Sequence, residues 1–244
     1  MSHLDTINQL QRGNPLSNPD PLKGEGPVNK ALAFATKMLY KPAGWTGPHK
    51  IAYPSGLPPK SVCVKVAEAA YDSSPPKFIR EWELIDHTAT LKFYKSGDKI
   101  LVGVRGTASR GDVYADLHII ANGLNRSPRF HSDLKKLKEV KAEYPDITFY
   151  GASHSLGGSL CDLFIKNGLL QSAVSYNPAV ERNELKTTRN YRIYMANDAL
   201  FNLGQYGNVG EVRKQSNVSS IDPVAAVQIY KSHLLSNFKG GGMF

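Results

Sequence analysis

Residues 147–158, ITFYGASHSLGG, decide the fold class of this 244-residue chain. The first half of the stretch is rich in β-branched and aromatic residues, which is typical of a buried strand. The second half supplies the small residues of a sharp turn and leads into an apolar helix, which we predict over residues 156–166. A strand, a sharp turn and a helix in this order predict a nucleophile elbow with Ser155 at its apex.

The turn leaves little room for side chains two positions before or after Ser155. Gly157 meets this requirement on one side, whereas Ser153 stands where the strict G-x-S-x-G pattern has glycine. Serine is still a small residue, and the apolar helix after Gly157 and Gly158 makes the match more specific. The alternative interpretation is a glycine-rich turn between strand and helix that has no catalytic role.

Catalysis by Ser155 would need a base and an acid, because a serine hydroxyl is a weak nucleophile at neutral pH. His233 is the only histidine after Ser155, and it is the predicted base if the partners follow in the order serine, acid, histidine. The candidate acids are Asp162, Asp198 and Asp222. We favour Asp198, because it follows a predicted strand at the sheet edge where the other two groups must converge.

The two other aspartates have structural interpretations. Asp162 is predicted to lie on the helix behind the elbow and to point away from the strand ends. Asp222 precedes Pro223, a pair that indicates the N-cap and first residue of a helix.

An oxyanion formed by attack of Ser155 would need preorganised hydrogen-bond donors. The backbone N–H of Leu156, the residue after the nucleophile, is the first predicted donor. Thr107 is the second, because it follows the predicted strand 100–104 through Arg105 and Gly106, at the same end of the sheet.

Short apolar runs alternate with helical patterns from about residue 60, which predicts an α/β fold with a mostly parallel central sheet flanked by helices. The predicted strands are 91–94, 100–104, 147–150, 173–176 and 191–195. The predicted helices are 60–71, 132–144, 156–166 and 224–238.

Residues 1–60 contain nine of the 15 prolines, so we expect an N-terminal arm with little regular structure. The exception is an amphipathic pattern over residues 28–40, which predicts a short helix that packs on the domain or binds a membrane surface or partner. The α/β domain is expected to cover residues 61–239. The glycine-rich tail, 240–244, is expected to be flexible.

The composition excludes several classes of protein. The formal net charge is +9, but the basic residues are spread along the chain, which disfavours a nucleic-acid-binding protein. Residues 1–10 are too polar for a signal peptide, and no apolar run reaches the ~18 residues of a membrane span, so we expect a soluble chain. Cys63 and Cys161 belong to no metal or redox motif and are expected to be buried thiols.

Several of these motifs resemble those of the fungal-type (class 3) triacylglycerol lipases, and the likeness covers most of residues 62–238. The matching segments are VAEAAY (66–71), VGVRGTASRGDVYAD (102–116), PRFH (128–131), HSLGG (154–158), SYNP (175–178), AND (196–198) and SHLLSNF (232–238). The resemblance implies an α/β-hydrolase fold and a lid within residues 108–126. It also implies site residues, namely Ser155 as nucleophile, Asp198 as acid, His233 as base, and Thr107 and Leu156 as oxyanion donors.

Our first hypothesis is a serine ester hydrolase that cleaves lipid or other apolar carboxylic esters through an acyl-enzyme, without metal or cofactor. Contact with a membrane surface is a further expectation, since the chain is basic and the predicted lid is partly apolar. The alternative is a non-catalytic α/β-hydrolase-like module that binds protein partners through its N-terminal arm. A peptidase or acyltransferase with the same triad is a third hypothesis.

Overall fold

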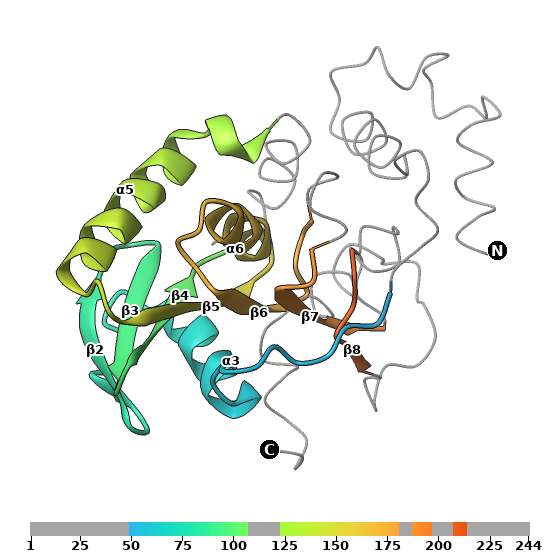
Figure 1. Cartoon of the computed structure of the whole chain (residues 1–244), viewed down its shortest axis with the longest axis horizontal. Coiled ribbons are helices and arrows are strands. Elements are labelled where there is room, and N and C mark those ends of the chain that lie inside the picture. Colours follow the sequence, from blue (N-terminus) through green and yellow to red (C-terminus); the bar gives the residue numbers. More distant parts are fainter. Residues whose placement is uncertain (1–48, 107–122, 181–186, 197–206, 214–244) are drawn as a thin grey trace, which may run out of the picture. The chain divides into compact units, whose positions relative to one another are not determined.

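The computed structural model describes residues 49–106, 123–180, 187–196 and 207–213, which form an eight-stranded sheet with helices on both faces (Figure 1). The strand order in the sheet follows the sequence from β1 to β8. The strands are β1 (Phe78–Ile79), β2 (Trp82–His87), β3 (Leu91–Ser96), β4 (Lys99–Val104), β5 (Thr148–His154), β6 (Ser172–Tyr176), β7 (Asn190–Met195) and β8 (Glu211–Arg213).

The sheet has an antiparallel and a parallel part that meet at β4. Strands β1 to β4 pair antiparallel, and strands β4 to β8 pair parallel. The carboxyl ends of β4, β5, β6 and β7 therefore lie along one edge of the sheet. Open α/β sheets bind their ligands outside this edge, which is where the candidate site must be sought.

Helix α3 (Lys60–Ala69) covers one face of the sheet, and α5 (Pro128–Glu143) and α6 (Leu156–Lys166) cover the other (Figure 1). Alternation along the strands explains this division. On β5, Tyr150 and Ala152 join the apolar core beneath α3, whereas a Cβ at Gly151 would lie 2.9 Å from the Cys161 sulfur of α6. Glycine at position 103 lets α3 approach β4 closely, because a Cβ there would lie 2.7 Å from the Val66 carbonyl oxygen.

The predicted strands and helices that fall within the described residues are confirmed, but their ends differ by up to four residues, and β5 extends four residues beyond its predicted end at Tyr150. Strands β1, β2 and β8 were not predicted. Two of them have only two or three residues, and β2 carries the polar sequence WELIDH, so none shows a strong apolar run. Together, β1 and β2 give the sheet the antiparallel end that the prediction lacked.

Helix α5 begins four residues before its predicted start at position 132. The Ser127 side chain accepts a hydrogen bond from the Phe130 N–H at 3.1 Å, and Pro128 occupies the first turn. Both are ordinary helix-start signals that the apolar periodicity alone does not report. The buried stripe consequently includes Phe130, whose ring stacks on Phe164 of α6. Helix α3 ends at Ala69, two residues before its predicted end at Tyr71.

Part of the predicted N-terminal arm packs on the sheet domain. Lys50 forms a β-bridge with Val209, and Leu57 is buried in the core beneath α3. The predicted helices 28–40 and 224–238 lie outside the described residues, and the domain limits at 60, 61 and 239 stay predictions.

Cys63 and Cys161 are both buried free thiols, as predicted, and burial raises the pKa of each to about 12.

Within the described ranges, no helix combines the length and apolar character that crossing a membrane requires.

Candidate active site

Ser155 occupies a sharp turn between the end of β5 and the first residue of α6. Its backbone has φ 56° and ψ −129°, a region that residues with a side chain rarely adopt. Such a conformation costs of order 1–3 kcal/mol and persists only where the surrounding structure enforces it. The predicted elbow conformation of Ser155 is therefore present in the backbone.

Packing around the turn explains why small residues flank Ser155. A Cβ at Gly157 would lie 2.4 Å from the Val104 carbonyl oxygen of β4, and one at Gly158 would lie 2.3 Å from the Pro178 Cβ. Ser153 fits in place of glycine because its hydroxyl lies 2.7 Å from that of Ser175, within hydrogen-bonding distance, on the neighbouring strand β6. The departure from the G-x-S-x-G pattern is thus accommodated by a polar contact below the turn.

Backbone hydrogen bonds hold the turn at both sides of Ser155. The Ser155 N–H donates to the Tyr176 carbonyl at 3.1 Å, and the Ser155 carbonyl accepts from the N–H groups of Gly158 and Ala179. Leu156 is the first residue of α6, so its N–H precedes the hydrogen-bond ladder of the helix and lies at the positive end of the helix dipole. A negative charge that develops beside Ser155 would be stabilised there.

The Tyr71 hydroxyl links the elbow to the loop after β4. Tyr71 lies just beyond the end of α3, and its hydroxyl oxygen accepts a hydrogen bond from the Gly106 N–H at 3.0 Å. The same oxygen lies 3.0 Å from Nδ1 of His154, the residue before Ser155. A Cβ at Gly106 would lie 3.0 Å from the Ser155 Cβ, so Gly106 lies directly against the turn.

Arg129 of α5 contacts the same loop from the opposite side. Its guanidinium donates to the Arg105 carbonyl, and a second, longer hydrogen bond of 3.5 Å joins it to the Gly106 carbonyl. Asp133 pairs with Arg129 at 3.4 Å and accepts a hydrogen bond from Thr90. Burial raises the pKa of the Asp133 carboxyl, while the hydrogen bond from Thr90 and the charge of Arg129 act in the opposite direction.

A buried polar network lies beneath the elbow on the side of α6, and the sequence analysis missed it. Asp162 of α6 forms an ion pair of 2.9 Å with Arg192 of β7, and both side chains are 0% exposed. The Asn190 amide donates to the other Asp162 oxygen at 2.7 Å. Ser175 donates to Asn190 and contacts Ser153, which joins the network to the elbow. The polar residues at alternate positions of β7 were the available signal.

Asp162→Asn is expected to lower the free energy of unfolding by about 3–5 kcal/mol, because it leaves the Arg192 charge buried without its counter-charge. Urea denaturation measures the change. Glu211→Gln is the matched control, since its ion pairs with Lys60 and Arg213 are partly exposed and should each contribute no more than about 1 kcal/mol. Equal losses in the two variants would contradict the assignment of the cost to burial.

The structure places two of the predicted site residues, Ser155 and Leu156, side by side at the start of α6. Thr107, Asp198 and His233 lie outside the described residues, as does the alternative acid Asp222. The segments that lead to two of them reach the edge of the sheet where Ser155 lies. Gly106 packs on the turn at Ser155, and β7 ends at Met195, whose N–H donates to the Asn177 side chain beside the end of β6.

No group of three His, Cys, Asp or Glu side chains that could hold a metal ion occurs among the residues that the structure describes. Both carboxylate oxygens of Asp162 accept hydrogen bonds, one from the Asn190 amide and one from the Arg192 guanidinium. Asp162 therefore has a structural role in the described part of the chain.

Comparison with known proteins gives one sequence relative and several structural likenesses. No family model matches the chain. It is 24% identical over 113 residues to an Arabidopsis thaliana protein named as a GDSL esterase/lipase, a match that covers 43% of this chain. The chain spans about a third, 32%, of the length of that curated relative.

Two solved lipases have a similar arrangement of the backbone. The Lip2 lipase of Yarrowia lipolytica is 16% identical with a TM-score of 0.44, over 70% of this chain and 82% of the lipase. A triacylglycerol lipase of Penicillium expansum is 19% identical with a TM-score of 0.45, over 63% of this chain and 77% of the lipase.

Proposed function

We propose that the chain is a serine carboxylic ester hydrolase that acts on lipid or other apolar esters through an acyl-enzyme. Ser155 is the nucleophile, His233 the base and Asp198 the acid, and the oxyanion is bound by Leu156 and Thr107. The observation that carries the proposal is the backbone conformation of Ser155, a non-glycine residue at positive φ between a buried strand and a helix N-terminus. Strain of this kind clusters at functional sites.

In the first half of the reaction, His233 accepts the Ser155 hydroxyl proton while the serine oxygen attacks the ester carbonyl carbon. The carbonyl oxygen gains the negative charge of a tetrahedral intermediate. The Leu156 N–H and the Thr107 donor stabilise this charge, since they are oriented before the reaction begins. His233 then donates its proton to the leaving alcohol, and the acyl group stays on Ser155.

In the second half, His233 removes a proton from water, and the water oxygen attacks the acyl carbon to form a second tetrahedral intermediate. Its collapse breaks the bond to the Ser155 oxygen, which takes the proton back from His233, and the carboxylic acid is released. Asp198 holds the imidazole in the required tautomer and stabilises the imidazolium in both halves. No step calls for a metal or a cofactor. The placement of Gly106 against Ser155 supports Thr107 as a donor, because Thr107 is the next residue along the chain.

A fluorophosphonate probe tests the nucleophile directly. An activated serine is covalently labelled, whereas the non-catalytic module, which would use its N-terminal arm to bind protein partners, leaves the probe unreacted. Labelling that requires Ser155, together with hydrolysis of a series of simple esters of increasing chain length, supports the proposal and identifies the substrate class. Failure of the wild-type chain to react and to hydrolyse any ester of the series contradicts it.

Thr107→Ala is expected to lower kcat for ester hydrolysis by roughly 10²-fold, which is the scale for removing one oxyanion donor, because it removes the side-chain hydroxyl and leaves only the backbone N–H of Thr107 as a donor. The fold should persist, since the substitution removes only a hydroxyl and a methyl group. Steady-state kinetics on a soluble ester gives the result. A rise in KM at constant kcat would instead identify Thr107 as a residue that contacts the substrate.

Deletion of residues 1–27 is expected to leave kcat on soluble esters within about twofold of the full chain. The deleted stretch contains no candidate catalytic group, and it stops well before Lys50 and Leu57, which pack on the sheet domain. Activity assays before and after deletion test this. A folded but inactive truncation would show that the arm completes the site.

A further inference from the structure

Arg129 reaches two successive peptide carbonyls that directly precede the proposed oxyanion residue Thr107. One arm of its guanidinium donates to the Arg105 carbonyl and the other to the Gly106 carbonyl, at 3.5 Å. The Gly106 N–H, on the far side of the first peptide, donates to the Tyr71 hydroxyl. The first peptide plane is thereby held from both sides, and the second is held at its oxygen.

A trans peptide is planar, so a group that fixes the direction of a carbonyl also fixes the direction of the N–H that follows it. The carbonyl of Gly106 and the N–H of Thr107 belong to one peptide. We propose that Arg129 is a positioning residue for the oxyanion site, which orients the Thr107 backbone N–H through its hold on the Arg105 and Gly106 carbonyls. This inference rests on the proposed function.

The guanidinium is itself held in place, as a positioning role demands. Its Nε pairs with Asp133, one turn further along α5, and the Asp133 side chain is almost fully buried. Thr90 donates to the second oxygen of Asp133, and the Thr90 carbonyl accepts from the Arg105 N–H at 2.9 Å. The first turn of α5 and the loop after β4 are therefore joined by one continuous set of hydrogen bonds.

The planar fork of arginine matters here, because a lysine has one charged nitrogen and cannot reproduce the two fixed donor directions. Arg129→Lys keeps a positive charge beside Asp133, so it tests geometry without leaving that carboxyl unpaired. Arg129→Ala removes both the positive charge and the two donor directions. The expected effect of Arg129→Ala is a loss of kcat of roughly 10²-fold, the scale of a 1 Å misplacement at a reacting centre, with KM within about twofold.

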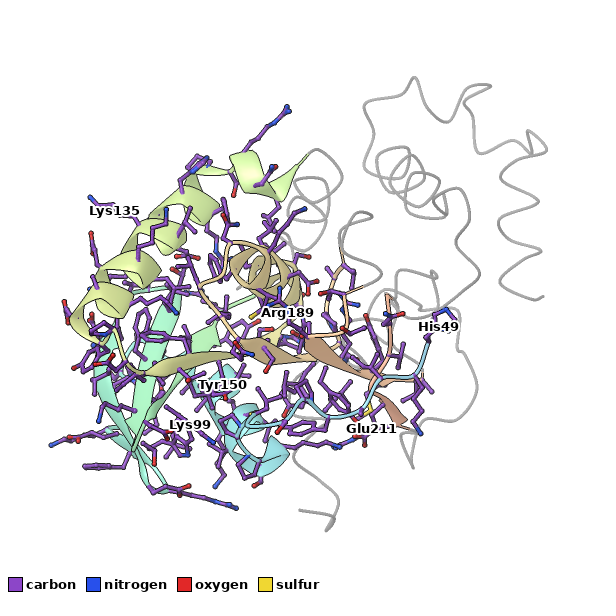
Figure 2. The ribbon with its side chains drawn as sticks, viewed as in Figure 1. His49, Lys99, Lys135, Tyr150, Arg189 and Glu211 are labelled. Carbon is purple, nitrogen blue, oxygen red and sulfur yellow. The ribbon has the colours of Figure 1, made fainter. Side chains whose placement is uncertain are left out.

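The experiment measures kcat and KM on a soluble ester for the wild type, Arg129→Ala and Arg129→Lys, with amide hydrogen exchange of each protein. We expect Arg129→Lys to lose less kcat than Arg129→Ala. We also expect faster exchange at the Gly106 amide, while β5 and α6 exchange as in the wild type. Arg189→Ala is the matched control, because Arg189 (Figure 2) also donates to a backbone carbonyl, that of Ile165, but precedes the amino end of β7.

The outcomes separate this inference from the proposed function. If the wild type is active and Arg129→Ala keeps its kcat, the positioning role is wrong. An equal loss in Arg189→Ala, or a KM increase alone, would also overturn it. If the wild type has no esterase activity, the proposed function fails, and the positioning role in catalysis fails with it. Hydrogen exchange at the Gly106 amide of Arg129→Ala then shows separately whether Arg129 holds this backbone in place.

Discussion

Ser155→Ala is expected to lower kcat for ester hydrolysis by at least ~10³-fold while the chain stays folded. The hydroxyl is the proposed attacking group, and its loss leaves only substrate binding and oxyanion stabilisation, since triad members act as a unit. His233→Ala should lose about as much, for the same reason. The strained backbone at Ser155 belongs to the turn between β5 and α6 and does not depend on the hydroxyl.

A matched control separates loss of the nucleophile from loss of a buried serine in general. Ser172 at the start of β6 is buried, and its hydroxyl makes no hydrogen bond within the described part of the chain. Ser172→Ala should therefore leave both kcat and the free energy of unfolding close to the wild-type values. Near-native activity of Ser155→Ala or of His233→Ala would disprove the mechanism.

Asp198→Asn is expected to lower kcat by several orders of magnitude, about 10⁴-fold, because the amide holds the imidazole in the wrong tautomer. The prediction depends on β7, which ends at Met195, beside the end of β6 and at the same edge of the sheet as Ser155. Kinetics with a soluble ester, in which kcat and KM are separated, measures the effect.

Asp222→Asn is the comparison that makes the assignment of the acid testable. Asparagine caps a helix nearly as well as aspartate, so this variant should keep its activity and lose only a fraction of the ~1 kcal/mol that an N-cap contributes. Thermal denaturation and kinetics of the two variants, measured side by side, give the ranking. The opposite ranking would assign the acid to Asp222 and contradict the proposed role of Asp198.

Local patterns were enough to predict the central strands, the helix after the elbow and the conformation around Ser155. Strand β5 begins with one β-branched and two aromatic residues, Thr148, Phe149 and Tyr150. Gly157 and Gly158 stand where any side chain would collide with Val104 or Pro178. The start of α5 was predictable in principle from Ser127 and Pro128, but apolar periodicity alone placed it four residues too late.

The sequence by itself determined that a strand, a turn and a helix meet at Ser155, because backbone preference and apolar period are properties of neighbouring residues. Only the tertiary structure decided which polar side chains are buried together. Asp162 pairs with Arg192 because β6 and β7 follow β5 in the sheet beneath α6. Arg129 reaches the loop after β4 because α5 packs on that face. These pairings depend on which strands become neighbours in the sheet, and no local pattern in a single sequence specifies that order.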